Sequence, residues 1–115
     1  MLAVYIAHQL SGDVEANRAA ASRWVGLLAM TFDIAPIADW IIMTGQWTEE
    51  HRARGLRIDM ELVSRADEMW MVGPHLSNGM ALEMGAAQGF GKPVVNLVGL
   101  DHAQAVACLR GRGYR

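Results

Sequence analysis

The sequence contains only one cysteine, Cys108, among its 115 residues. A single thiol cannot form a disulfide within the chain, and a lone cysteine is typical of proteins of the reducing cytoplasm. The sequence also has no cluster of histidine, cysteine and carboxylate residues at the spacing of metal ligands. We therefore predict no disulfide, no metal site and no cofactor.

The chain also lacks a strong excess of charge of either sign. Ten basic and twelve acidic residues give a net charge of −2, which does not provide the positive surface that duplex nucleic acid requires. A nucleotide-sized ligand is still compatible, because it needs only one local anion site. No apolar run approaches the length of a membrane span, and the segment Met1–Ala7 lacks the length and basic flank of a signal peptide. We expect a soluble, cytoplasmic protein.

No repeat, linker or low-complexity tract divides the sequence. Its 115 residues, 52% hydrophobic and 19% charged, suit a compact globular protein with one hydrophobic core but not two. We predict a single domain over residues 1–115, with a frayed tail at about residues 110–115.

Short apolar runs alternate with helical patterns along the chain. The predicted strands are Leu2–Ala7, Ala35–Ile37, Glu68–Val72 and Pro93–Val98. The predicted helices run from the Asp13 cap to about Met30, from the Thr48 cap to about Ala66, from Ser77 to Phe90, and from the Asp101 cap to about Leu109. The segment Asp39–Trp47 fits either a strand or a buried turn. This alternation predicts a single α/β domain with a doubly wound, flavodoxin- or Rossmann-like parallel sheet covered on both faces.

Glu83 is the only formally charged residue between Ser77 and Gly91. On a helical wheel it lies about 60° from Met80 and about 40° from Ala87, within the apolar stripe of its helix. A carboxylate on a core-facing stripe is costly to bury without a partner. This position makes Glu83 a candidate for chemistry.

The segment before Glu83 joins a predicted buried strand to a helix, which is where open α/β sheets hold their ligands. Ser77 is a natural N-cap, so the amides that follow it, including that of Gly79, point beyond the helix end. The turn formed by Ser77, Asn78, Gly79 and Met80 is therefore a candidate ligand-binding turn.

Asp59 has the same relation to the apolar stripe of the preceding helix, because it lies about 60° from Leu56 on the wheel. Two acids on the core-facing sides of successive helices can converge on one pocket. Their pKa values can then move apart, which leaves one ionised as a nucleophile and the other as an acid or hydrogen-bond anchor. The alternative is that each carboxylate reaches solvent or pairs with a neighbour such as Arg52 or Arg57.

A motif connects the two candidate helices. Its parts in chain order are Asp59, then Ala66-Asp67 at the helix end, a strand, and Ser77-x-Gly79-x-x-x-Glu83. This motif resembles the nucleoside 2-deoxyribosyltransferase superfamily, which includes the 2′-deoxynucleoside 5′-phosphate N-hydrolases and many small bacterial and phage proteins. The run Tyr5-Ile6-Ala7 resembles the first strand of that superfamily, and the resemblance extends over residues 1 to about 98.

The resemblance implies a role for each matching residue. Glu83 matches the nucleophile that attacks C1′ of the deoxyribose and expels the base, giving a covalent glycosyl-enzyme. Asp59 matches the acid that positions the sugar and assists the leaving base. Tyr5 matches an aromatic residue near the sugar and the acid. Ser77 and Gly79 match the loop that cradles a 5′-phosphate in the hydrolases.

The chain departs from the hydrolases in the loop after the first strand. Their loop contains glycine and arginine, whereas this chain has His8-Gln9-Leu10-Ser11-Gly12, and the missing arginine affects phosphate binding. His8 can replace part of that role as an imidazolium, or it is a solvated loop residue. Similarly, Arg52, Arg54 and Arg57 form either a solvated helix face or a phosphate clamp.

We therefore expect cleavage or transfer at the N-glycosidic bond of a nucleoside or nucleoside 5′-monophosphate, through an intermediate on Glu83, by a homodimer or larger homo-oligomer. One alternative is a non-catalytic nucleotide-binding or sensing domain, which the altered first loop favours. Another is a structural, oligomer-forming subunit, which the high methionine and tryptophan content favours. Trp47 is a candidate for stacking on a base, whereas Trp24, Trp40 and Trp70 are expected to fill the core or an interface.

Overall fold

The computed structural model describes residues 1–45 and 48–115; Trp47, the candidate for base stacking, lies outside these residues. The strands are β1 (Leu2–Ala7), β2 (Ile34–Ile37), β3 (Glu68–Met71) and β4 (Val94–Asn96). The helices are α1 (Val14–Thr31), α2 (Trp40–Met43), the 3-10 turn η1 (Glu49–His51), α3 (Arg52–Arg65), α4 (Asn78–Gly89) and α5 (His102–Gly111). Apart from the start of α3, these bounds agree with the predicted strands and helices to within two residues.

All four strands are parallel and follow the order β2-β1-β3-β4. The chain therefore leaves β1 toward one edge of the sheet through α1 and later returns on the other side of β1 to form β3. This order confirms the predicted doubly wound, flavodoxin-like sheet. Ligands of such sheets bind beyond the carboxyl ends of the two strands where the winding reverses, which here are β1 and β3.

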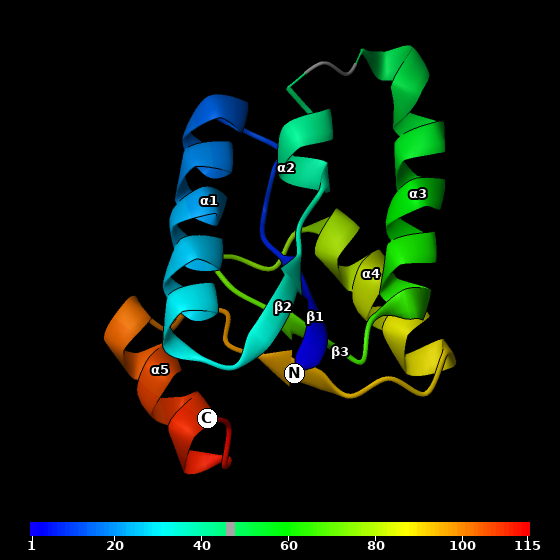
Figure 1. Cartoon of the computed structure of the whole chain (residues 1–115). Coiled ribbons are helices and arrows are strands. Elements are labelled where there is room, and N and C mark those ends of the chain that lie inside the picture. The colour runs from blue at the N-terminus through cyan, green and yellow to red at the C-terminus, as the bar shows by residue number, and fades with distance from the viewer. Residues whose placement is uncertain (46–47) are drawn as a thin grey trace.

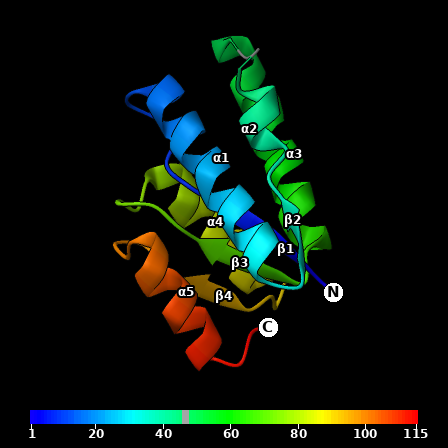
Figure 2. The ribbon, with the colours of Figure 1, turned by 60° about the vertical axis from the view of Figure 1, so that its left-hand side comes forward.

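Helices cover both faces of the sheet (Figures 1 and 2). α1 and α5 pack on one face against a cluster that includes Val4, Ile6 and Trp70. α2, α3 and α4 pack on the other face against Tyr5 and Met69, among others. Because side chains alternate between the two faces of a strand, Tyr5 points from β1 toward α3 and α4.

The N-caps were predicted correctly for three helices. The side chains of Asp13, Ser77 and Asp101 each accept a hydrogen bond from a first-turn amide. The Thr48 cap was wrong: α3 begins at Arg52, after η1, and has no side-chain cap. Instead, the amide of His51 donates to the carbonyl of Thr48 at 3.0 Å, which forms a 3-10 turn before the helix, and the amide of Thr48 donates to Nδ1 of His51 at 3.2 Å.

The C-terminal tail is not frayed, contrary to the sequence prediction. The Tyr114 ring packs edge-on against Trp70 with centroids 5.1 Å apart, and its hydroxyl donates to Oε1 of Glu68 at 2.5 Å. The carbonyl of Arg115 accepts from the amide of Asp33 at 2.7 Å. The tail thus packs against the amino end of β3 and the residue before β2.

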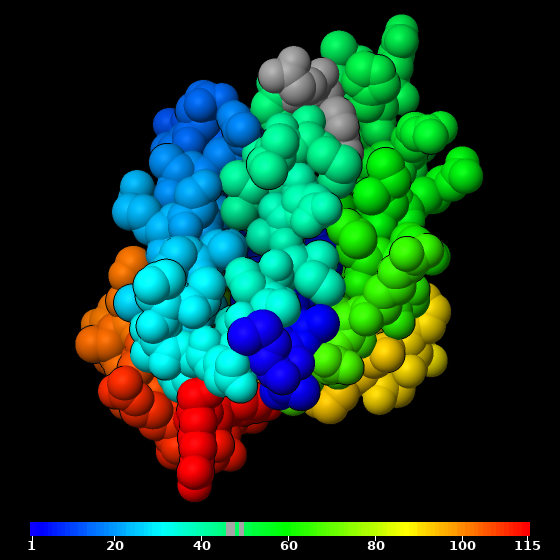
Figure 3. All heavy atoms as spheres, viewed as in Figure 1, coloured from blue at the N-terminus to red at the C-terminus, as the bar shows by residue number. Residues whose placement is uncertain are grey.

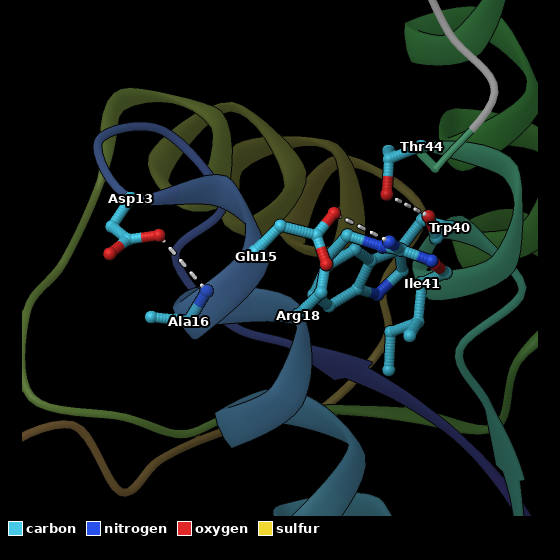
Figure 4. Close-up of polar contacts among 7 residues, drawn as sticks. All are labelled: Asp13, Glu15, Ala16, Arg18, Trp40, Ile41 and Thr44. Carbon is cyan, nitrogen blue, oxygen red and sulfur yellow. Dashed lines mark hydrogen bonds and ion pairs between the residues drawn. The ribbon is translucent and has the colours of Figure 1, made fainter.

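The ambiguous segment before residue 46 forms α2, which fills the space between α1 and α3 (Figure 3). Arg18 of α1 donates from Nε to the carbonyl of Ile41 at 2.8 Å (Figure 4). The indole nitrogen of Trp40 donates to the carbonyl of Ile6 in β1 at 2.9 Å. These two contacts fix α2 over the carboxyl end of β1. Within the described residues, no helix has the length and apolar character needed to span a bilayer.

Candidate active site

A cavity of about 420 Å³ lies beyond the carboxyl ends of β1 and β3. Its lining residues come from the loop after β1 and the start of α1 (His8, Leu10, Ser11, Val14), from α2 to α3 (Trp40, Thr44, Thr48, Arg52, Leu56, Asp59), and from the α4 end (Ser77, Gly79, Met80, Glu83). This volume is in the range of small-molecule sites. The fold thus forms a ligand-sized cavity at the position that its topology predicts.

Glu83 lies on the sheet-facing side of α4 and is only 8% exposed. The hydroxyl of Tyr5, which is fully buried in β1, donates a hydrogen bond to its Oε2. Burial raises the pKa of the Glu83 carboxyl to about 7, the Tyr5 hydrogen bond opposes that rise, and the nearby Asp59 adds to it. Burial and the neighbouring carboxylates raise the pKa of Tyr5 far above its usual range, so Tyr5 is a neutral hydrogen-bond donor at every relevant pH.

Asp59 reaches the same cavity from the second turn of α3, where it is also 8% exposed. Its Oδ1 is buried and has no hydrogen-bond partner among the described residues. Burial without compensation raises the pKa of the Asp59 carboxyl to about 6. A buried acceptor without a partner is costly, so this oxygen is placed to receive a hydrogen bond from a ligand.

The two carboxylates thus face one cavity, and neither pairs with an arginine. The ion pairs among the described side chains are Arg18 with Glu15 and Arg65 with Glu61, both on helix surfaces. Because two buried acids in one site titrate as a coupled pair, the pair holds a single proton near neutral pH. Because the pKa of Glu83 is about 7 and that of Asp59 about 6, this proton lies mainly on Glu83, and the Tyr5 hydrogen bond increases the fraction in which Glu83 is ionised and Asp59 is protonated.

His8 is buried beside the cavity, at 5% exposure. Its Nδ1 lies 2.7 Å from the carbonyl of Gln9, which can only accept, so Nδ1 carries the proton. Its Nε2 is buried without a partner, and burial lowers the pKa of the imidazole. The ring is therefore neutral at neutral pH, which argues against both the imidazolium that would bind phosphate and a solvated loop residue.

Three residues of the candidate ligand-binding turn line the cavity, and one does not. Ser77, Gly79 and Met80 line it, with the Ser77 hydroxyl accepting the amide of Met80 at 3.2 Å. Asn78 is exposed and is not among the lining residues. The α4 N-terminus therefore faces the ligand through its backbone and through Ser77 rather than through the Asn78 amide.

The sequence patterns did not predict that α2 and the start of α3 form one wall of the cavity. Trp40 was expected to fill the core or an interface, and it does belong to the core while also lining the cavity. Arg52 was left between a clamp and a solvated face; it is exposed, and it lines the cavity together with Thr44 and Leu56. The Leu56 position could have been found on the α3 wheel, since it is one turn before Asp59. The α2 contribution depends on contacts such as that of Arg18, which connect distant segments (Figure 4).

A second, wider depression of about 610 Å³ lies near the start of α5. Its titratable lining residues are Asp101 and His102. The Asp101 carboxylate is already used in the capping box of α5, and His102 packs against Trp24 at 4.2 Å. No buried carboxylate lines it, so the cavity of Asp59 and Glu83 is the candidate active site. Among the described residues, no group of three or more potential metal ligands is assembled.

Comparison with protein families places the chain in a recognised group. A family model for a domain of unknown function (DUF7768) matches residues 2–97, which span all four strands and the helices that carry Asp59 and Glu83. The chain belongs to this family. None of the curated proteins matches it.

Proposed function

We propose that this protein cleaves or transfers at the N-glycosidic bond of a nucleoside or nucleoside 5′-monophosphate, with Glu83 as nucleophile. The observation that carries the proposal is the arrangement of Glu83, hydrogen-bonded by Tyr5, and Asp59, with an unpartnered oxygen, in one cavity. Structural carboxylates on a core face would normally be paired or solvated. Two unpaired acids of raised pKa in a cavity are typical of catalytic sites.

The resemblance to the nucleoside 2-deoxyribosyltransferase superfamily suggests that the substrate is a nucleoside or nucleotide. Four of the residues that carry it in the sequence line the cavity, namely Asp59, Ser77, Gly79 and Glu83, and the fifth, Tyr5, donates a hydrogen bond to Glu83. The cavity volume of about 420 Å³ accommodates a nucleoside. The sequence pattern and the geometry therefore point to the same residues, and the resemblance suggests the reaction.

In the first step, an ionised Glu83 oxygen attacks C1′ and forms a glycosyl ester as the C1′–N bond breaks. The bonding electrons leave with the base, and the proton on Asp59 transfers to the base nitrogen or holds the departing base by a hydrogen bond. In the second step, water or another base attacks C1′ and releases Glu83. This is the retaining, two-step logic of glycosidases.

Tyr5 adjusts the charge of the nucleophile. Its hydrogen bond favours the ionised form of Glu83 in a buried site, where the pKa of that carboxyl would otherwise rise further. As the glycosyl ester forms, the negative charge on Glu83 disappears and the hydrogen bond weakens. Because Tyr5 binds Oε2 of Glu83, it also orients the carboxylate and leaves Oε1 for the attack on C1′.

The second candidate is a nucleotide-binding or sensing domain that has the same cavity without turnover. It is favoured by the loop after β1, where the buried neutral His8 stands in place of a phosphate-binding cation. Such a domain would bind nucleosides or nucleotides without releasing the base. Assembly into a homo-oligomer stays a prediction in either case.

Incubation with a panel of nucleosides and their 5′-monophosphates, followed by chromatography for free base, tests the proposal. We expect base release by the wild type and its loss in Glu83→Gln, with a control in Glu61→Gln, whose side chain is exposed and pairs with Arg65. Base release that survives in Glu83→Gln would refute the nucleophile. Tight binding of a panel member without release, unchanged in Glu83→Gln, would favour the binding domain.

A further inference from the structure

One face of α3 lines the cavity over three successive turns. Arg52, Leu56 and Asp59 all contribute to the lining, at positions i, i+4 and i+7, which lie on the same side of a helix. At a rise of about 1.5 Å per residue, Arg52 lies about 10 Å from Asp59 along the helix axis. A ligand that extends from the carboxylates along α3 would therefore lie beside Leu56, and its far end would lie near Arg52.

The space between the carboxylates and Arg52 is bounded by apolar side chains. Leu10, Trp40 and Leu56 line it from three different elements. The indole of Trp40 is held by its hydrogen bond to the carbonyl of Ile6 at 2.9 Å, so this wall has a fixed position. Apolar walls beside a polar sugar-cleaving end suit the flat ring of a base.

The charge of Arg52 is not explained by the stability of α3. Arg52 is the first residue of the helix, and no acidic residue lies in the first turn. A positive charge at a helix N-terminus is opposed by the helix dipole. No ion pair involves Arg52 among the described side chains, and a guanidinium can only donate hydrogen bonds.

Thr44 supplies the complementary group. It lines the same cavity, and its hydroxyl donates to the carbonyl of Trp40 at 2.7 Å (Figure 4). With its proton used in this way, Oγ1 presents only lone pairs to a ligand. The cavity thus offers a donor at Arg52 and an acceptor at Thr44.

We infer that Arg52 and Thr44 read the edge of the base, and that the substrate base carries a carbonyl oxygen beside a ring N–H. A 6-oxopurine or a 4-oxopyrimidine has this pattern, whereas the corresponding amino bases present the reverse pattern of donor and acceptor. This inference depends on the proposed function, because it places the sugar at Glu83 and the base along α3. It makes Arg52 a specificity-determining residue.

Four ligands test the inference: deoxyinosine, deoxyadenosine and their 5′-monophosphates. The two bases differ in the carbonyl or amino group at position 6 and the matching state of N1, and the phosphate varies independently. Dissociation constants are measured in Glu83→Gln, which retains an acceptor for Tyr5 and prevents turnover, and then with Arg52→Gln, Arg52→Lys or Arg54→Gln added. Arg54 is the matched control, because it is exposed on the same helix, as Arg52 is, but is not among the lining residues.

We expect the oxo base to bind about tenfold more tightly than the amino base, with or without phosphate. Arg52→Gln removes this preference, Arg52→Lys retains part of it, and Arg54→Gln leaves it intact. A loss in Arg52→Gln confined to the two monophosphates would overturn the inference and make Arg52 a phosphate ligand. An equal loss for all four ligands, no change, or no binding by any of them would also overturn it.

Base release by the wild type separates this inference from the proposed function. If the oxo base is preferred in an Arg52-dependent way but no base is released, the inferred recognition of the base by Arg52 is supported and the proposed reaction at Glu83 is refuted. If base is released with the same Arg52 dependence for oxo and amino bases, the chemistry stands and the reading of the base edge fails.

Discussion

The hydroxyl of Tyr5 in β1 donates a hydrogen bond to Oε2 of Glu83 in α4, two residues separated by 78 positions in the sequence. This bond joins a central strand of the sheet to the helix that begins at the cavity. It is also the hydrogen bond that lowers the pKa of Glu83 against the effect of burial. The properties of the candidate nucleophile therefore depend on a residue that does not line the cavity.

Removal of that hydrogen bond should change the pH dependence of the proposed reaction. In Tyr5→Phe, the pKa of Glu83 rises, so the acid limb of the pH–rate profile for base release moves to higher pH. The loss of a hydrogen bond to a charged group lowers the rate at neutral pH by about ten- to a hundredfold. If circular dichroism shows that Tyr5→Phe is folded and its pH–rate profile is unchanged, Tyr5 does not tune the pKa of Glu83.

If the proposed function holds, the wild-type protein should have a bell-shaped pH–rate profile for base release. The proposed reaction needs an ionised Glu83 and a protonated Asp59, which is the minor arrangement of a pair whose pKa values are raised to about 7 and about 6. The pair holds one proton mainly between these values, so kcat/KM for base release should be largest at about pH 6 to 7. The alkaline limb should disappear in Asp59→Asn, whereas a wild-type rate that rises continuously to pH 9 would contradict the acid role of Asp59.

The same two carboxyls make the folded protein less stable at alkaline pH. Their pKa values are higher in the folded state than the ordinary 3.8 and 4.5, so unfolding releases protons between about pH 4 and pH 7. The free energy of unfolding therefore falls as pH rises through this window and levels off above it. In urea denaturation, Asp59→Asn or Glu83→Gln should be more stable than the wild type at pH 8, on the order of 2 kcal/mol.

The comparison at pH 4 provides the control for this effect. There the carboxyls are protonated in the folded state, and the variants should differ little from the wild type. Because the two groups interact, the double variant should gain less than the sum of the single variants. Variants that are equally destabilised at both pH values would indicate a packing role instead.

Local patterns predicted the sheet and one half of the candidate site. Ser77 was recognisable as a cap from residue type and position, and its side chain does cap α4. Glu83 and Asp59 were predicted to face the core from the helical wheel, and both are buried. These features depend on neighbours within a few residues, so the sequence pattern contains the information.

The other half of the site depends on contacts between distant segments. Trp40 is placed by a bond to Ile6, 34 positions away, and α2 by the bond of Arg18 to Ile41, 23 positions away. No local pattern encodes these pairs. For the same reason, the Tyr114 contact with Glu68 was missed and the tail was predicted to fray. Polar and aromatic side chains without a local partner were the least predictable residues.

The tail contact has a measurable effect on stability. Tyr114→Ala removes a ring that packs on the buried Trp70 and a hydroxyl that donates to Glu68. We expect a loss of about 2 kcal/mol in the free energy of unfolding. Tyr114→Phe, which retains the ring, should lose about half as much. Because Tyr114 contacts the amino end of β3, whereas the cavity lies beyond the carboxyl ends of β1 and β3, ligand affinity should not change, and a large change in affinity would contradict this separation.

Gly73, after β3, determines the position of the His8 ring. Its φ is +102°, and a Cβ built there would lie 2.7 Å from Cδ2 and 2.8 Å from Nε2 of His8. Gly73→Ala should therefore lower the free energy of unfolding by about 2 kcal/mol or more. It should also displace the His8 ring toward the cavity and so weaken ligand binding.

Gly85→Ala is the matched control, since nothing lies within 4 Å of a Cβ at that position of α4. It should stabilise the helix by about 0.5 to 1 kcal/mol without affecting binding. Equal effects of the two substitutions would show that close packing of Gly73 on His8 does not shape the cavity.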